Sequence, residues 1–356
     1  MDNPLFAEKL IAWYQINKRD LPWRHTIDPY KIWLSEIILQ QTRVAQGLPY
    51  YLSFVERFPN VQDLALAPEK EVLRLWQGLG YYSRARNLHA CAKAIVQQYG
   101  GKFPADYQQL LKLKGIGPYT AAAIASFAFR IPVPVFDGNV FRVLSRIFGL
   151  HNDISTNTGR QSFVELGSEL ISQKEPDQYN QAIMEFGALH CTPQQPSCQE
   201  CLFKTDCFAF IMGQQKQLPV KSKKVKVTNR YFNYFVIPYN KGLFMKPRNT
   251  KDIWQGLYDF HLLETRKQQD TSIVMEQVLD YSRDQVKLTL GFESKLYRHK
   301  LTHQHIHARF FHLELNEKVS IDNLSARFGV NWYSHEQVQD LPKPILIDNY
   351  LKDALF

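Results

Sequence analysis

The spacing of apolar residues changes in character along the chain. Up to about residue 215, apolar side chains recur every three and four residues between short breaks at Gly and Pro, which is the pattern of successive amphipathic helices. Asp28 and Pro29 are suited to opening one helix over 29–41, because Asp accepts hydrogen bonds from free N–H groups and Pro fits the first helical position. Other helices are expected to begin near Asn3, Pro49, Pro68, Ser83, Asp106, Pro118, Gly138, Gly159 and Tyr179.

Beyond residue 228, short runs rich in β-branched and aromatic residues replace the helical pattern and predict strands. These runs are 231–238, 243–246, 258–263, 287–290 and 309–315, and one helix is expected over 272–281. Between the two patterns, residues 216–226 hold five lysines, one proline and no acid, which indicates an exposed linker. The sequence therefore predicts a multi-domain chain, with an all-α region over 1–215, a basic linker over 216–228 and an α+β region over 229–356.

Length and composition narrow the class of protein. The chain has 356 residues, enough for about two domains with separate cores, and its 45% apolar and 22% charged residues exclude a disordered chain. No apolar run reaches the roughly 18 residues of a membrane helix, and no basic segment leads into an apolar one at the start, so we expect a cytoplasmic protein without a membrane partner. Lys and Arg total 43 against 34 for Asp and Glu, and the net charge of +9 favours a polyanionic partner.

Four of the five cysteines are clustered, and they could surround one metal centre. Cys191, Cys198, Cys201 and Cys207 supply thiolates, which are the soft ligands that both zinc and iron–sulfur clusters favour. Their spacing matches neither the ferredoxin patterns nor a paired zinc ribbon. The residues alone therefore leave both metals open. Cys91 lies apart from the others and is expected to be a small buried side chain.

Two glycines separate the end of a leucine-rich helix from an alanine-rich helix, in residues 113–120 (LKGIGPYT). Gly115 and Gly117 allow a tight turn and a close approach of the backbone to a ligand, and the N–H groups that open the next helix can bind an anion. An ordinary helix–helix turn has the same Gly-x-Gly pattern. With Lys112 and Lys114 beside it, a nucleic-acid backbone is the favoured ligand.

Glu36 is surrounded along its expected helix by large apolar residues, in the run 33–39 (WLSEIIL). A carboxyl group buried there would have a raised pKa and could stay protonated near neutral pH as a general acid. A glutamate on the solvent-facing side of the helix is the commoner outcome and would need no such role. The residue by itself leaves both alternatives open.

Asp137 directly precedes an expected helix start, in the run 135–140 (VFDGNV). The N–H groups at a helix start favour the ionised form of a carboxyl group, and a simple N-cap would look the same. Together with Glu36, however, Asp137 makes a pair in which one acid tends to be protonated and the other charged. Such a pair suits cleavage of a glycosidic bond through an oxocarbenium-like transition state.

These features occur in one order that resembles a known group of enzymes. The Gly-Ile-Gly turn, the Phe-Asp-Gly-Asn-Val run and the Cys-x6-Cys-x2-Cys-x5-Cys loop are similar to those of helix-hairpin-helix DNA glycosylases that carry a 4Fe-4S cluster. Within this superfamily the chain most resembles the adenine DNA glycosylase (MutY) family over nearly its whole length, including 21–24 (LPWR), 33–44, 78–88 and 180–182. The resemblance implies a hairpin at about 106–130 and a cluster loop at 191–207, and it selects 4Fe-4S over zinc.

The resemblance also implies an activity. Members of this family remove adenine paired with 8-oxoguanine (or guanine) from double-stranded DNA in base excision repair, after the adenine has been flipped out of the duplex. Glu36 matches the family's general acid, and Asp137 matches the carboxylate that stabilises the sugar cation, with Asn139 and Tyr119 beside it. Bifunctional relatives carry Lys at the position of Tyr119, so strand cleavage is not expected. A monomer associated with the nucleoid is expected.

Further positions match residues that bind the substrate in this family. Arg24 and Gln181 match positions of the adenine pocket. Gln41 and Tyr81 match residues that insert into the opened duplex, where an aromatic ring can replace lost stacking. The Gly-Ile-Gly turn with Lys114 matches the contact to the DNA backbone.

The C-terminal region resembles the family's Nudix-like 8-oxoguanine recognition domain, through 254–260 (WQGLYDF) and 299–303 (HKLTH). Thr302 and His303 match the residues that contact 8-oxoguanine. The family usually has Phe-Ser-His where this chain has Leu-Thr-His, and the added methyl group bears on 8-oxoguanine discrimination. We find no Arg-Glu-x-x-Glu-Glu box, so nucleotide hydrolysis is not expected there.

Alternate histidines form one more pattern, at His303, His305 and His307. Side chains at alternate positions of a strand share a face because of its period of two, and no cysteine lies nearby, so a metal-ligand role is not expected.

Two other functions compete with the leading one. They are a glycosylase for another damaged base, and a non-catalytic iron–sulfur protein that binds DNA or senses redox state, for which neither Glu36 nor Asp137 would be needed.

Overall fold

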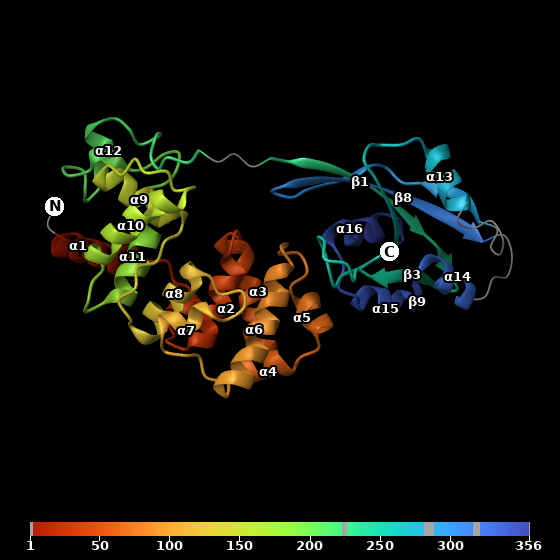
Figure 1. Ribbon diagram of the computed structural model, residues 1–356, viewed down its shortest axis with the longest axis horizontal. Helices are drawn as coiled ribbons and strands as arrows, with labels where there is room; N and C mark the ends of the chain where they lie inside the picture. The colour runs from red at the N-terminus through yellow and green to blue at the C-terminus, as the bar shows by residue number, and fades with distance from the viewer. Residues whose placement is uncertain (1–2, 223–225, 281–287, 316–320, 356) are drawn as a thin grey trace. The chain divides into compact units, whose positions relative to one another are not determined.

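The computed structural model describes residues 3–222, 226–280, 288–315 and 321–355 (Figure 1). The chain divides into two compact units. The first comprises Met1–Leu66 and Asn87–Lys223, and the second comprises Ala67–Arg86 and Lys224–Phe356. The second unit thus includes a segment from the expected all-α region, and the functional limits 1–215, 216–228 and 229–356 stay a prediction.

Helices build the first unit, and its described residues contain no strand. In chain order they are α1 (Asn3–Asn17), η1 (Pro22–Arg24), α2 (Pro29–Leu39), α3 (Val44–Arg57), α4 (Val61–Leu66), α6 (Ser83–Tyr99), α7 (Tyr107–Leu111), α8 (Pro118–Phe129), α9 (Gly138–Phe148), α10 (Asn157–Leu170), α11 (Pro176–Leu189), η2 (Cys198–Glu200) and α12 (Phe208–Ile211), with the first turn of α6 in the second unit. The buried core of this unit includes Phe6, Phe163 and Phe186. Among the described residues, none of the helices combines the length and the apolar character that crossing a membrane requires.

Helix α2 fixes the position of Glu36. Asp28 caps the helix by accepting a hydrogen bond of 2.9 Å from the N–H of Tyr30, and Pro29 occupies the first position, as expected. Trp33 and Leu34 are buried on this helix, which packs against α3 and α8. Most side chains of α2 are buried in this packing, and Glu36 is one of them.

Most expected helix starts are confirmed to within three residues, but the start at Pro49 is wrong. Pro49 lies inside α3, which begins at Val44. A proline costs this helix one hydrogen bond, and burial of Tyr51 and Phe54 on the same helix offsets that loss. Helix α4 was not predicted, because only six residues carry its pattern.

The second unit combines two sheets with helices. Its helices are α5 (Glu69–Leu75), α13 (Thr271–Asp280), α14 (Ile321–Phe328), α15 (His335–Asp340) and α16 (Ile345–Ala354). One sheet has the order β5-β1-β8-β6, with β7 also paired to β8, and consists of β1 (Thr228–Val236), β5 (His261–Thr265), β6 (Leu288–Glu293), β7 (Tyr297–Lys300) and β8 (Gln304–Leu315). The other has the order β2-β3-β4, with β9 paired to β3, and consists of β2 (Pro238–Tyr239), β3 (Gly242–Pro247), β4 (Tyr258–Asp259) and β9 (Asn331–Ser334).

The expected architecture, an all-α region followed by an α+β region, is confirmed, while strand limits differ. The strand expected over 309–315 is only the second half of β8, and the strand expected over 258–263 is interrupted at Phe260, which separates β4 from β5. Strands β7 and β9 were missed, because their polar residues lack an apolar alternation. Tyr281 and Lys287, at the ends of an expected helix and strand, lie outside the described residues.

Candidate active site

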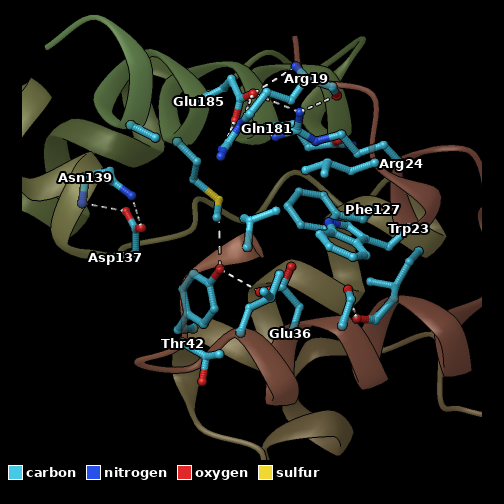
Figure 2. Close-up of a pocket in the computed structure, with 18 of the residues that line it drawn as sticks. Arg19, Trp23, Arg24, Glu36, Thr42, Phe127, Asp137, Asn139, Gln181 and Glu185 are labelled. Atoms are coloured by element: carbon cyan, nitrogen blue, oxygen red, sulfur yellow. Dashed lines mark hydrogen bonds and ion pairs between the residues drawn. The ribbon is translucent and has the colours of Figure 1, made fainter. Parts of the chain in front are cut away.

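A cavity of about 200 Å³ in the first unit is lined by all four residues expected to be catalytic (Figure 2). Helix α2, η1, α8, the start of α9 and α11 all contribute to its wall. Its lining consists of Arg19, Leu21, Trp23, Arg24, Thr26, Ile32, Ser35, Glu36, Leu39, Thr42, Val44, Tyr119, Phe127, Asp137, Asn139, Gln181, Met184, Glu185 and Ala188. Apolar side chains therefore alternate with charged, hydroxyl and amide groups around the cavity, and such convergent polar groups can orient a small ligand such as a base.

Glu36 is 8% exposed and lines this cavity, so the alternative of a solvent-facing glutamate is excluded. Burial raises the pKa of Glu36 to about 7, and the negative charge of Asp137 contributes to the rise. The hydroxyl of Tyr119 opposes it, because it donates a hydrogen bond of 2.6 Å to Oε2 of Glu36. Near neutral pH, this carboxyl group can therefore carry a proton.

Asp137 caps α9 and faces the same cavity. Its Oδ1 accepts hydrogen bonds of 2.8 Å from the N–H groups of Asn139 and Val140, and its Oδ2 accepts one of 2.7 Å from Nδ2 of Asn139. Burial nevertheless raises the pKa of Asp137, against the opposing effect of these three donors. The N–H groups favour the ionised form of Asp137, as expected, but desolvation, which the sequence analysis left out, has the larger effect on its pKa.

A cluster of opposite charges around the buried Glu185 forms another part of the wall. Glu185 is 1% exposed and accepts hydrogen bonds from Arg24 at 3.0 and 2.6 Å and from the Arg19 side chain at 2.8 and 2.6 Å. Burial alone would raise the pKa of Glu185, but the two arginines lower it to about 2. Gln181 lies one turn before Glu185 on α11 and accepts a hydrogen bond of 2.7 Å from Tyr14.

Sequence reasoning selected Arg24 and Gln181 but missed Arg19 and Glu185. The spacing of four residues between Gln181 and Glu185 could have indicated that both lie on one face of a helix. The ion pair itself joins positions 161 residues apart and has no local signal.

The expected DNA contacts of the first unit lie on its surface. Gly115 has a φ of +83° and Gly117 caps α8, and both are exposed, as is Lys114. Gln41 is also exposed and has a φ of +53°, a conformation that is uncommon outside glycine. A turn with open backbone N–H groups followed by a helix start can bind a phosphate.

The other expected contacts belong to the second unit. Tyr81 is 40% exposed with a φ of +47°, and its hydroxyl is hydrogen-bonded to the hydroxyl of Thr302. Thr302 and His303 form the exposed two-residue turn between β7 and β8, which the N–H of Leu301 closes by donating to the carbonyl of Gln304 at 2.7 Å. The structure therefore joins three of the expected substrate contacts in one small surface.

The four clustered cysteines line a single second cavity of the first unit. Nη1 of Arg146 donates to the sulfur of Cys191 at 3.4 Å, and the N–H of Phe203 donates to the sulfur of Cys201 at the same distance. Within the described ranges, no group of three or more His, Cys, Asp or Glu side chains is arranged to hold a single metal ion. Four thiols with N–H donors around one cavity fit the donor chemistry of an iron–sulfur cluster.

Comparisons with known proteins agree with this geometry. Residues 34–169 match the family model of the HhH-GPD superfamily base excision DNA repair protein, and residues 233–353 match the model of the NUDIX domain. The adenine DNA glycosylase of Buchnera aphidicola subsp. Schizaphis graminum is 32% identical over 344 residues, which are 96% of this chain and 96% of that protein. The human adenine DNA glycosylase is 42% identical over 222 residues, which are 60% of this chain and 41% of that protein.

Solved structures give the same result for the fold. A thermostable thymine-DNA glycosylase has a TM-score of 0.55 and 29% identity, covering 59% of this chain and 97% of its own. Endonuclease III in a non-covalent DNA complex has a TM-score of 0.51 and 21% identity, covering 61% of this chain and 100% of its own. Because the similarity to one relative extends over nearly the whole of both chains, this chain belongs to the adenine DNA glycosylase family, whose helix-hairpin-helix domain is that of base excision DNA repair proteins.

Proposed function

We propose that the chain removes adenine from pairs with 8-oxoguanine or guanine in double-stranded DNA, by acid-assisted hydrolysis of the N-glycosidic bond. The single observation that carries the proposal is the burial of Glu36 against Tyr119 in a cavity that also holds Asp137. A carboxyl group with a pKa of about 7 can deliver a proton to a base, which an ordinary ionised glutamate cannot. The family to which the chain belongs supports adenine as that base.

Glu36 has the role of general acid. In its protonated form it gives its proton to N7 of an adenine flipped into the cavity, and the base then withdraws electrons from the C1′–N9 bond. That bond breaks, adenine leaves with the bonding electrons, and the sugar becomes an oxocarbenium ion. Ionised Glu36 then accepts a proton from the water that attacks C1′, which restores the starting state. Proton transfer of this kind contributes about 10²- to 10⁴-fold to a rate.

Asp137 stabilises the sugar cation in this proposal. Its ionised carboxylate supplies negative charge, and hydrogen bonds from Asn139 and Val140 hold its orientation before the cation forms. Tyr119 orients Glu36 and offers no amine, so a Schiff base to the sugar cannot form and the DNA strand stays intact.

Arg24 and Gln181 bind the edge of the flipped adenine in this proposal. Both side chains line the cavity, and each is already held by a partner, Arg24 by Glu185 and Gln181 by Tyr14. Such preorganised donors and acceptors bind a base at little entropic cost. Gln41 and Tyr81 occupy the space that the flipped base leaves in the duplex.

The second unit reads the base opposite adenine. The turn formed by Thr302 and His303 is exposed and is joined to Tyr81 by a hydrogen bond, which supports a shared role in contacting 8-oxoguanine. The backbone N–H groups around Gly115 and Gly117, with Lys114, bind a DNA phosphate. The enzyme acts as a monomer on chromosomal DNA in the cytoplasm, in association with the nucleoid.

A 4Fe-4S cluster is the proposed cofactor, held by Cys191, Cys198, Cys201 and Cys207. The lining of one cavity by all four thiols supports a cluster, since a cluster needs ligands around a wider centre than one zinc ion does. The cluster fixes the fold of residues 191–207, and no step of the reaction passes through it.

A panel of duplexes tests this function. Each duplex contains one 8-oxoguanine:adenine, guanine:adenine or thymine:adenine pair, or one pair with a different damaged base. Base release and strand cleavage are measured in single turnovers. We expect adenine release from the first two without strand cleavage, and little from thymine:adenine. Release of a different base would favour the alternative glycosylase, and tight binding without any base release would favour a non-catalytic protein.

A further inference from the structure

The alternate histidines of β8 belong to a larger basic surface of the second unit that has no part in the reaction described above. His305 and His307 lie on one side of β8, because side chains two residues apart in a strand point to the same face. Residues that pair across neighbouring strands also share a face. The register of the sheet therefore identifies the rest of this surface.

On β7, Lys300 pairs with His305 and Arg298 pairs with His307. On the other side of β8, strand β1 contributes Asn229 beside His305, and Tyr231 beside His307. We name these six residues the basic sheet face: Asn229, Tyr231, Arg298, Lys300, His305 and His307.

The basic sheet face combines exposed polar side chains with a fixed pair of rings. Arg298, Lys300 and Asn229 are exposed, while His307 stacks on Tyr231 with ring centroids 4.9 Å apart and its Nε2 lies 3.0 Å from Oδ1 of Asn229. These contacts hold the two rings in place and leave the cationic side chains of β7 at the surface.

The same side of the sheet is covered further along β8. There Phe311 and Leu313 pack in a core with Val274 and Val278 of α13. Figure 1 shows the paired ends of β1 and β8 extending beyond α13, so the helix does not cover the basic sheet face. Among the described residues, the nearest acid at a paired position on this side of the sheet is Glu293, which pairs with Phe311. Its carboxylate is bound to Arg309 at 2.8 Å.

We infer that the basic sheet face binds the phosphate backbone of the DNA duplex, next to the base pair under repair. Two observations point to this partner. One is charge complementarity, since Arg298 and Lys300 are cations on a surface where no paired position supplies an acid. The other is continuity, since Lys300 is separated from the proposed 8-oxoguanine contact by one residue, Leu301.

The inference requires DNA to be the substrate and does not require 8-oxoguanine to be the base that is read. A backbone contact fixes orientation without carrying sequence information, so it strengthens binding to damaged and undamaged duplexes alike. Contacts from the Thr302–His303 turn should instead alter the preference of the protein for the damaged duplex over the undamaged one. The two proposals can therefore fail separately.

Binding of the full-length protein to duplexes at several salt concentrations tests the inference. The duplexes are an undamaged one and one with 8-oxoguanine opposite a 2′-fluoroadenosine, which resists hydrolysis. For the double variant Arg298→Gln/Lys300→Gln, we expect binding to both duplexes to weaken by the same factor. The slope of log affinity against log salt concentration should decrease in magnitude by about two, one for each lost cation. The charge-preserving variant Arg298→Lys/Lys300→Arg should bind like the wild type.

Lys352→Gln is the matched control, because Lys352 is an exposed cation of α16, whose Tyr350 stacks on Phe310 at the opposite side of the sheet. All variants change exposed side chains, and thermal unfolding checks that they stay folded. The inference is overturned if the double variant keeps the wild-type salt dependence, or if it loses no more affinity than Lys352→Gln. It is also overturned if only binding to the damaged duplex weakens, since that outcome would make the surface a reader of the base.

Discussion

Tyr119 donates a hydrogen bond of 2.6 Å to the carboxylate of Glu36, although the two residues are 83 positions apart in the chain. The bond joins α8 to α2 and limits the pKa of the proposed acid, since it opposes the larger rise in pKa that burial causes. A substitution of Tyr119 can therefore test the proposed role of Glu36, as a substitution of Glu36 itself can.

Tyr119→Phe removes this donor while keeping the ring. The hydrogen bond favours the ionised form of Glu36, so its loss should raise the pKa of Glu36 above its value of about 7. Because the protonated form is the active acid, the fall in adenine release at high pH should move upward, by about one pH unit. A single-turnover pH profile measures this, and an unchanged or lowered midpoint would show that Tyr119 does not act through Glu36.

The raised pKa of Glu36 also predicts how stability depends on pH. Its folded value of about 7 exceeds the reference value of 4.5, so the folded protein binds more protons than the unfolded chain between these limits. The free energy of unfolding should therefore fall as the pH rises through this window. Glu36→Gln removes the ionisable group and should exceed the wild type in stability at about pH 8, by at most about 3 kcal/mol, but not at about pH 4. Denaturant unfolding at both pH values checks the sign.

Asp137→Asn separates the charge of this residue from its capping role. Asn remains an acceptable N-cap, so stability should change by less than about 1 kcal/mol, while adenine release should fall by about 10²- to 10³-fold because the sugar cation loses its counter-charge. Thr156→Ala is a matched control, since Thr156 caps α10 by accepting from the N–H of Gly159 at 3.0 Å and does not line the cavity. Equal losses of activity in the two variants would assign Asp137 a purely structural role.

Glu185→Gln tests the charge cluster. Loss of one carboxylate leaves Arg19 and Arg24 without their shared partner, so we expect destabilisation of about 3 kcal/mol and weaker adenine release through a misplaced Arg24. The pKa of Glu185 is lowered to about 2, so this stabilisation is present above the reference value of 4.5 and is lost as the pH falls toward 2. Unfolding of both proteins at about pH 7 and about pH 3 should therefore show a difference that shrinks in acid.

Metal analysis tests the proposed cofactor. The purified protein should be brown, with iron and sulfide in equal amounts, and Cys198→Ser should lose iron and stability together because one ligand of the cluster is gone. A colourless protein with stoichiometric zinc would replace the cluster by a structural zinc site.

Local signals in the sequence predicted much of the helical fold and the acids. Asp28 with Pro29, and Asp137 with Gly138, gave two helix starts correctly, because capping depends on adjacent residues. The limits of β8 and the presence of β7 were not predicted, since β7 has polar residues and is stabilised by pairing with β8. Pairing is decided by tertiary context, which local propensity does not report.

The same distinction between local signals and tertiary context applies to the candidate site. Glu36 and Asp137 were identified from their neighbours and from resemblance, but whether Glu36 is buried depends on the packing of α2 against α3 and α8. The partners Tyr119 and Glu36, or Glu185 and Arg24, meet only when distant helices pack together. Desolvation of Asp137 likewise depends on the whole cavity, which is why its direction of pKa shift was not foreseen.

The most direct test of the central claim is single-turnover release of adenine by Glu36→Gln from a duplex with one 8-oxoguanine:adenine pair. Gln has nearly the same shape as Glu but cannot deliver a proton, so we expect the rate to fall by about 10²- to 10⁴-fold while the duplex is still bound. A rate equal to that of the wild type would contradict the assignment of Glu36 as the acid that releases the base.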